Sequence, residues 1–320
     1  MQNPTIPKLL DKKTRYSYAK ARQTWSIKNS QIVFDMIIPW FFIAVALMTF
    51  WVFNGNTVIS IFISVLAPIY FSFWRQAFSS FFHEAAHYNL TKNKKLNDLI
   101  SNLILTPFTG LWVQQYRDHH WEHHKNFGQN GDTETSYVLP LNVRGLIEAL
   151  TGIYLIKTAM RYFNVASAKN EKREINLSSA LQFIAGLIFM FSVQFLIAVF
   201  LFLFINPYAG FVWMFSVFIT DPLLAKIRQT LEHRNEHDKV SASLLENKNL
   251  GVNQMFGDDF FSRYFGGAGF NRHLLHHLDP SISYTRFDEF EQFLLEHSSN
   301  DYIEKRRVSY FSKFLQIINY

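Results

Sequence analysis

Four long apolar runs alternate with polar segments along the chain. They cover Met36–Phe53, Thr57–Phe78, Leu181–Ile205 and Tyr208–Leu224. Each is close to the about 20 residues that an α-helix needs to cross a bilayer core. The runs form two pairs, and only Asn54-Gly55-Asn56 and Asn206-Pro207 separate the members of each pair. Each pair therefore predicts a helical hairpin with a short turn.

These runs predict an all-α integral membrane protein, in which a bundle of four transmembrane helices carries a helical cap. Lys and Arg crowd the N-terminal and central polar segments, whereas neither hairpin turn carries a charge. The positive-inside rule then places both termini and the cap in the cytosol. We expect a single domain over residues 1–320, divided into an N-terminal segment (1–34), a first hairpin (35–80), a central cytosolic segment (81–178), a second hairpin (179–230) and a C-terminal cytosolic region (231–320).

The composition agrees with a membrane protein. Charged residues make up 18% of the 320 residues, whereas soluble domains carry about 25%. The net charge of +6 is interpreted as the positive-inside bias together with contact with anionic lipid headgroups. No basic cluster is interleaved with a nucleic-acid-binding motif, so no nucleic-acid partner is expected. The sequence contains no Cys, which excludes disulfides, thiolate metal sites and Cys nucleophiles.

Histidine is strongly clustered. Eleven of the 12 histidines lie in the short windows 83–87, 119–124, 233–237 and 273–277. In the predicted topology all four windows lie on the same side of the membrane, so they can converge beneath one bundle. This clustering is the main indication of function.

The first window, His83-Glu84-Ala85-Ala86-His87, places two imidazoles on one face of a helix that continues from the second span. Two nitrogens in that arrangement can bind one metal ion. The same residues match the HExxH motif of zinc proteases, with Glu84 as the base. A membrane metalloprotease is therefore an alternative, although one zinc ion would leave most of the other histidines unexplained.

The second window and the fourth window share an H-x-x-H-H spacing. In the second window His120 and His124 can share a metal, while His123 reaches a neighbouring one. His273, His276 and His277 repeat the spacing. His233 and His237 are also four residues apart, but only one of them needs to be a ligand. So many histidines exceed what one ion can hold, so two metal ions are implied. Neutral imidazole suits iron, zinc, copper and nickel; an all-histidine site suits redox-active iron better, but the ligand type alone leaves the metal open.

Carboxylates beside these windows can accept the second N–H of a ligand histidine and so orient the ring. The nearby carboxylates are Glu84, Asp118, Glu122, Asp132, Glu232, Glu236 and Asp279. The side chains that we select as candidates for this supporting role are Glu84, Asp118, Glu122, Asn271 and Asp279.

Taken together, the motifs resemble those of the membrane fatty acid desaturase and hydroxylase superfamily. The matching segments are HEAAH (83–87), RDHHWEHH (117–124), LEH (231–233) and NRHLLHHLDPSISY (271–284). The resemblance implies four transmembrane helices below a cytosolic cap that holds a non-haem di-iron centre. It implies nine metal ligands: His83, His87, His120, His123, His124, His233, His273, His276 and His277. His119, His237 and His297 are left outside this set.

The implied activity is O2-dependent desaturation of a fatty acyl chain that is linked to a lipid, coenzyme A or acyl carrier protein. Neither tail shows a cytochrome b5-like haem motif, so a separate donor of the ferredoxin or cytochrome b5 type is expected to supply electrons. A hydroxylase or ketolase that acts on a lipid, alkane or carotenoid at the same centre is an alternative. A metal transporter or sensor is a further one, but transporters usually place their ligands within the spans.

Overall fold

The computed structural model describes residues 9–129, 132–134, 137, 143–151, 153, 157, 177–234, 253–297 and 302–318. In these residues the regular elements are helices, and an isolated bridge pairs Met255 with Arg307. The prediction of an all-α protein is therefore confirmed. The helices are α2 (Lys12–Thr24), α3 (Asn29–Val52), α4 (Thr57–Ala86), α5 (Lys94–Ile100), η1 (Ser101–Leu105), α6 (Thr106–Thr109), α7 (Val113–Asn126), α8 (Val143–Leu150), α10 (Leu177–Phe204), α11 (Pro207–Phe215), η3 (Ser216–Thr220), α12 (Asp221–His233), α13 (Phe260–Gly266), η4 (Phe270–Arg272), α14 (His273–Leu278), η5 (Tyr284–Arg286), α15 (Phe287–His297), η6 (Glu304–Arg306) and α16 (Tyr310–Ile318).

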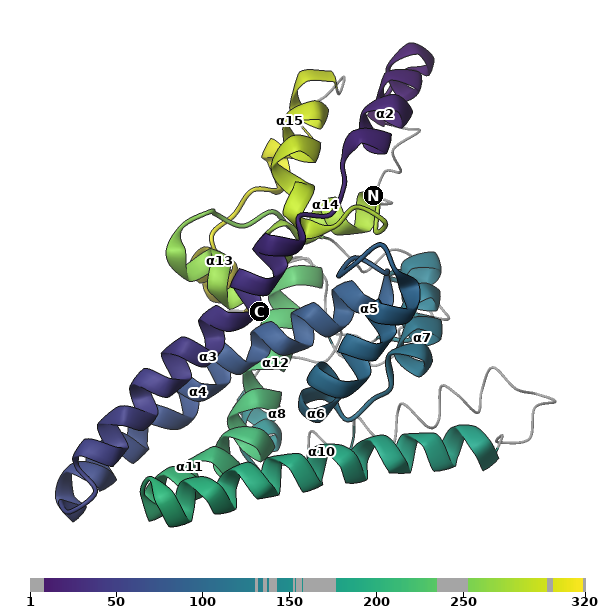
Figure 1. The fold of residues 1–320 in the computed structure, drawn as a ribbon. Helices are drawn as coiled ribbons and strands as arrows, with labels where there is room; N and C mark the ends of the chain where they lie inside the picture. Colours follow the sequence, from purple (N-terminus) through teal and green to yellow (C-terminus); the bar gives the residue numbers. More distant parts are fainter. Residues whose placement is uncertain are drawn as a thin grey trace.

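Four helical stretches of the described chain are long and apolar enough to cross a membrane, as predicted. They are Asn29–Val52, Thr57–Ala86, Ser178–Phe204 and Pro207–His233. Helices α3 and α4 pair as one hairpin, and α10 pairs with the continuous rod α11–η3–α12 as the other (Figure 1). The second and fourth stretches extend beyond their apolar runs, to Ala86 and His233. They thereby carry histidines out of the apolar region on rigid helix.

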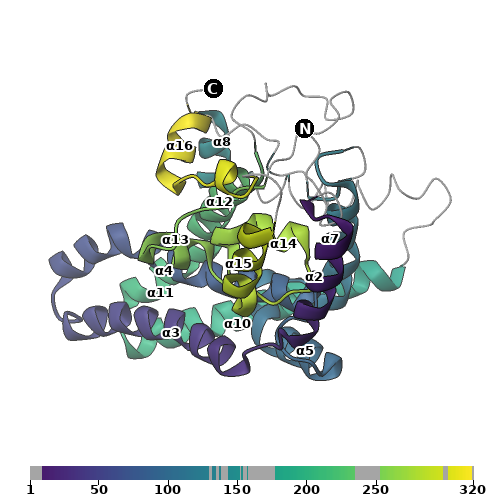
Figure 2. The same ribbon diagram turned by 90° about the horizontal axis from the view of Figure 1, so that it is seen from above.

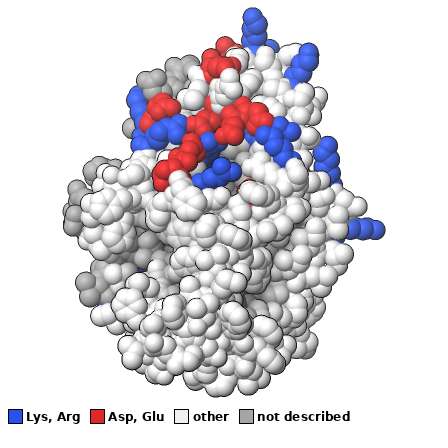
Figure 3. Space-filling view, turned by 60° about the vertical axis from the view of Figure 1, so that its left-hand side comes forward, with Lys and Arg blue, Asp and Glu red and all other residues white. Residues whose placement is uncertain are grey.

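The outer faces of the hairpins are apolar. Phe41, Phe62, Leu196 and Phe211 each expose 60% or more of their surface, which in water would be a large unfavourable patch. Figure 3 shows Lys, Arg, Asp and Glu gathered over one end of the molecule, while the surface below them is uncharged. This distribution is that of a membrane protein whose hairpins face lipid and whose cap faces water.

Asparagines begin the second helix of each hairpin. The Asn56 side chain accepts a hydrogen bond from the Ile59 amide (3.1 Å), and the Asn206 side chain accepts one from Tyr208 (2.9 Å). Such N-caps satisfy amide groups that the helix leaves unpaired. Buried Asn206 also donates to the Phe50 carbonyl and to the Ser60 hydroxyl, both at 3.1 Å. One turn residue therefore joins the tips of the two hairpins.

A buried polar network joins the hairpins within the bundle. The Arg75 guanidinium donates to Asp221 (2.8 Å) and to Gln194 (2.9 Å) and lies over the Trp213 ring (4.6 Å). Gln194 in turn accepts from the Trp213 indole (2.9 Å) and donates to the Pro107 carbonyl (2.7 Å). A charge is costly in so apolar a setting unless it is paired in this way. The network therefore fixes α4 against α10 and α12.

The cap has a hydrophobic core of its own. Buried aromatic rings of α4 belong to one core cluster with residues of α14 and α15. Figure 2 shows the helices of the cap from above. The buried residues of these three helices include Phe78, Phe81, Phe82, Leu274, Leu275, Phe287, Phe290 and Leu294. This packing holds the fourth histidine window, on α14, against the end of α4.

Candidate metal centre

The ends of α4 and α12 meet α7 and α14, and the four helices bring the nine predicted ligands together. All nine side chains are buried or half-buried. Helix α4 and its C-terminal cap supply His83 and His87, α7 supplies His120, His123 and His124, α12 supplies His233, and α14 supplies His273, His276 and His277. Of the three histidines left out, His297 is exposed on α15, half-buried His119 belongs to neither group described below, and His237 lies outside the described residues.

The first group joins three helices. One ring nitrogen of each member lies within 4.8 Å of the others, and the members are His83, His87, His120, His124 and His276. The Nε2 atom of His124 lies 3.0 Å from the Nε2 atoms of both His120 and His276. His120 and His124 thus lie in the same group, whereas His123 lies in the other.

The second group lies beside the first. Ring nitrogens of His123, His233 and His277 lie within 4.8 Å of one another. The Nε2 atom of His273 is 3.2 Å from that of His233 and 3.1 Å from that of His277. Because His273 and His277 are four residues apart on α14, they point to this group together, whereas His276 points to the other.

These nitrogens are suited to metal ions. In the described part of the chain, neither ring nitrogen of His83 or His87 has a hydrogen-bond partner, and the Nε2 atom of His123 also lacks one. Buried polar atoms are rarely left without partners. Metal–nitrogen bonds of about 2.0–2.1 Å hold ligand nitrogens roughly 3 Å apart, which is the spacing of the facing Nε2 atoms. One ion in each group would bind one nitrogen of each of these three rings.

Burial keeps most of the cluster in the metal-binding form. It lowers the pKa of His124, His276 and His277 well below the usual value, and neighbouring imidazoles lower the pKa further. These rings are therefore neutral at pH 7, and a neutral imidazole has a free lone pair for a metal. Burial would also lower the pKa of His123, but the Asp132 carboxylate next to it raises that pKa above its usual value.

Three ligand histidines are oriented through Nδ1. The Nδ1 atoms of His120 and His123 lie 2.7 Å from carboxylate oxygens of Glu134 and Asp132, and His233 Nδ1 lies 2.9 Å from Asn253 Oδ1. Each contact leaves Nε2 directed at the other histidines. Asp132 makes the type of contact predicted for it, whereas Glu134 and Asn253 were not anticipated.

The neighbouring histidines keep the Glu134 carboxylate ionised. Burial alone would raise its pKa, but the His120 and His123 rings, together with the hydrogen bond from His120, lower the pKa below the usual value. An ionised carboxylate at this point fixes the ring and increases its basicity toward a metal.

The predicted supporting residues separate into one that lies at the centre and four that do not. Buried Glu84 places Oε1 3.8 Å from His276 Nδ1 and 3.9 Å from His83 Nδ1, and its other oxygen accepts from the Tyr284 amide (3.1 Å). The contacts of the other four lead elsewhere, which corrects the prediction. Asp118 is exposed, Glu122 accepts from Lys125 and Asn126, Asn271 donates to Gly257 and Asp258, and Asp279 accepts from Tyr18 and pairs with Arg22.

Glu232 and Glu236 are the two remaining carboxylates near the histidine windows. Glu232 is buried beside His233, but it lies 3.4 Å from Arg228 and accepts from the Tyr310 hydroxyl at 3.3 Å. Glu236 lies outside the described residues.

Comparison with known families agrees with the geometry. A family model described as "Fatty acid desaturase" matches residues 59–311. The chain belongs to the fatty acid desaturase family. The matched region of this desaturase-family protein begins in α4, ends in α16 and contains all nine clustered histidines. A search of curated proteins found no match to the chain.

The role of Glu134 leads to a testable prediction for this desaturase-family protein. Glu134→Gln keeps the shape of the side chain but removes its charge, so metal affinity should fall about 10-fold or more, within the range known for supporting residues. Titration of metal-free protein with Fe²⁺ would measure this change. Glu122→Gln is the matched control, because Glu122 contacts Lys125 and Asn126. Equal affinities of the two variants would contradict the role of Glu134.

Proposed function

We propose that this protein is a membrane oxidoreductase that desaturates a fatty acyl chain with O2 at two iron ions. The division of nine histidines into adjacent groups of five and four carries the proposal. Imidazole suits iron, zinc, copper and nickel alike, and the desaturase family makes iron the choice among them. Two iron ions held there would supply the power to remove hydrogen from an unactivated C–H bond.

In this proposal each group of histidines holds one ion. The buried carboxylates of Asp132 and Glu134 stay behind the ligands and fix the orientation of His123 and His120. Glu84, which the protease alternative needs as a base, is buried against the Tyr284 amide. A single zinc site would also leave the second group without a role. The metalloprotease is therefore less well supported.

Aromatic rings around the histidines would exclude water from the reaction. Phe270 lies 4.6 Å from the His83 ring, Phe127 lies 4.7 Å from His277, and Tyr116 lies 5.2 Å from His120, measured between ring centroids. A dry site protects a strong oxidant from side reactions, and packed rings restrict where an acyl chain can lie. The protein would thus select the carbon atom that approaches the ions.

We further propose that the spans form a multi-pass topology with both termini and the metal centre on the cytosolic side. The uncharged hairpin turns and the charged cap support this orientation. The acyl substrate would come from the membrane. Because the sequence has no Cys, it cannot hold an iron–sulfur cluster through thiolates, so electrons would arrive from a separate ferredoxin or cytochrome b5 type donor.

Expression in a host with a simple lipid composition tests the proposal. Mass spectrometry of the host acyl chains should show a new species that is two hydrogens lighter than a host chain. His276→Ala should abolish this species, because His276 joins α14 to the ligands of α4 and α7. A product that retains oxygen would indicate a hydroxylase or ketolase instead. If the His276→Ala variant stays active and the Glu84→Gln variant loses its activity, the result would favour the metalloprotease alternative.

A further inference from the structure

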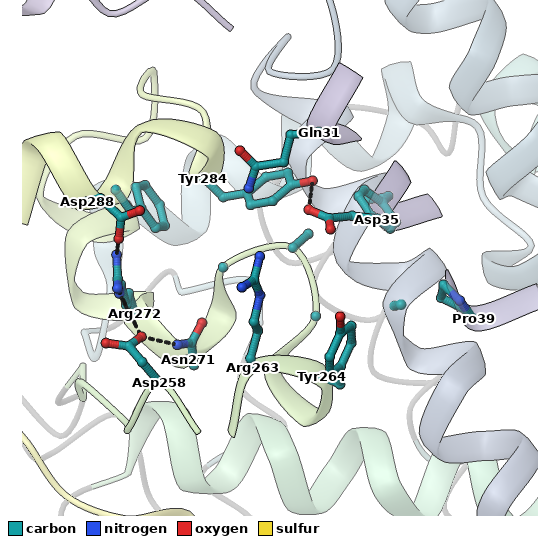
Figure 4. A pocket seen from close by; sticks show the side chains of 16 residues that line it. Gln31, Asp35, Pro39, Asp258, Arg263, Tyr264, Asn271, Arg272, Tyr284 and Asp288 are labelled. Atoms are coloured by element: carbon teal, nitrogen blue, oxygen red, sulfur yellow. Dashed lines mark hydrogen bonds and ion pairs between the residues drawn. The ribbon is translucent and has the colours of Figure 1, made fainter. Parts of the chain in front are cut away.

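A polar cavity of about 140 Å³ lies between α3 and α13, apart from the histidines (Figure 4). Gln31, Asp35 and Pro39 form its wall on α3, and their spacing of four places them on one face of that helix. Arg263 and Tyr264 of α13 contribute to the opposite side. The cavity is thus built from the start of the first membrane stretch and from a short helix of the cap.

Arg263 is a cation without a carboxylate partner. Its guanidinium points into the cavity in Figure 4, and no carboxylate of the described residues lies within 4.0 Å of it. The neighbouring Arg272 differs, since it pairs with Asp258 at 2.9 Å, with Glu291 at 3.3 Å and with Asp288. The charge of Arg272 is therefore neutralised within the protein, whereas that of Arg263 is available to a ligand.

The opposite wall of the cavity is acidic. Asp35 accepts a hydrogen bond from the Tyr284 hydroxyl at 2.9 Å and has no ion pair with a cation of the described residues. Arg263 and Asp35 act on each other electrostatically across the cavity but lie farther apart than the 4.0 Å of a direct ion pair, so the cavity is complementary to a ligand that carries both charges. Guanidinium binds phosphate strongly, and carboxylate binds ammonium.

The surroundings of the cavity indicate a lipid ligand. Phe260 and Phe261, at the start of α13, expose 60% and 51% of their surface, and Phe34 and Ile37 of α3 expose 63% and 57%. Apolar side chains so placed enter the acyl region of a bilayer, while polar groups next to them lie among the headgroups. The cavity is therefore level with the headgroups and open to a membrane lipid.

The cavity also adjoins the metal centre. Tyr284 supplies its hydroxyl to Asp35 in the cavity wall and its amide to Glu84, the carboxylate between His83 and His276. Phe81, two residues before His83, is part of the lining as well. Tyr284 thus contacts both the cavity wall and the carboxylate beside the histidines.

We propose that this cavity binds the zwitterionic phosphate–amine headgroup of a membrane phospholipid, with the phosphate on Arg263 and the amine facing Asp35. The binding site is a property of the folded chain and does not require metal. It therefore stands or falls separately from the proposed oxygen chemistry.

Native mass spectrometry of the full chain, purified metal-free in detergent, tests this proposal. Wild-type protein should retain phosphatidylethanolamine in preference to phosphatidylglycerol of the same acyl chains. Arg263→Gln should weaken retention of phosphatidylethanolamine at least about 10-fold, which corresponds to the loss of one charge-assisted hydrogen bond. Arg144→Gln, an exposed arginine on α8, should retain the lipid as wild type does. Asp35→Asn should abolish the preference for the zwitterionic lipid.

Two further measurements keep the proposal falsifiable. Arg263→Lys keeps the charge and should bind the lipid better than Arg263→Gln, which separates recognition from a folding defect. Soluble phosphoethanolamine and inorganic phosphate should fail to displace the lipid. Displacement by either at low concentration would show a site for a free phosphate compound and overturn the lipid assignment, as would unchanged retention in Arg263→Gln.

Discussion

Replacing His233 with alanine should lower the metal content from about two ions per chain to about one and reduce product formation by more than about 100-fold, beyond the cost of losing a supporting contact. His233 reaches the second group from the end of α12, where it meets His123, His273 and His277. Its loss leaves that group with three ligands, while the five histidines of the first group remain. Elemental analysis of purified protein and product analysis in the expression host would measure the two effects.

The control for this experiment is His297→Ala. His297 is exposed on α15, and its Nδ1 atom faces the Phe293 carbonyl, so both metal ions and the activity should persist. A His233→Ala protein that keeps two ions and normal turnover would contradict the assignment of His233. In that case His237 would become the candidate ligand in this window.

Replacing Arg75 with alanine should cause the largest loss of stability, about 3–5 kcal/mol, the range for a buried ion pair that loses one partner. The variant leaves the half-buried Asp221 carboxylate without the Arg75 donor, and the Gln194 amide oxygen keeps only its bond from the Trp213 indole. Thermal unfolding in detergent would show a large decrease of the midpoint, irrespective of metal.

A double variant separates the charge effect from lost packing. Arg75→Ala with Asp221→Asn removes both charges and should be more stable than Arg75→Ala alone, because no unpaired carboxylate remains. Arg144→Ala, at an exposed position on α8, should unfold close to wild type. Equal midpoints for the single and double variants would contradict a role for the buried charge.

Hydropathy alone located the four spans, because a bilayer demands long uninterrupted apolar segments and few other folds do. Helical spacing also predicts that His123 points away from His120 and His124, since 3.6 residues per turn decides which side chains share a face. The pairing of His276 with α4 and α7 could not be foreseen in the same way. It depends on how α14 packs, which local periodicity does not encode.

Supporting residues were predicted less well, for a related reason. Asp118, Glu122, Asn271 and Asp279 were chosen because they adjoin the histidine windows in sequence, yet the adjacent residue on a helix points about 100° away. Glu134 and Asn253 reach His120 and His233 from 14 and 20 residues along the chain. Neither Glu134 nor Asn253 lies in a helix, so no helical periodicity shows the direction of its side chain.

The cavity between α3 and α13 could not be predicted from the sequence either. Asp35 directly precedes the apolar run that begins at Met36. A charged residue in that position is typical of the end of a transmembrane helix and does not by itself indicate a binding site. Arg263 is separated from it by more than two hundred residues. Only the packing of α13 against α4 brings the two charges to opposite sides of one space.

The Asn206 side chain has a mechanical consequence. Its hydrogen bonds to Phe50 and Ser60 hold the two hairpins together at the end of the bundle farthest from the histidines. The two hairpins cannot separate at these tips without leaving several buried polar groups unsatisfied. If the two hairpins separate to admit an acyl chain, they must therefore separate at the cap end, with the hinge at the turns.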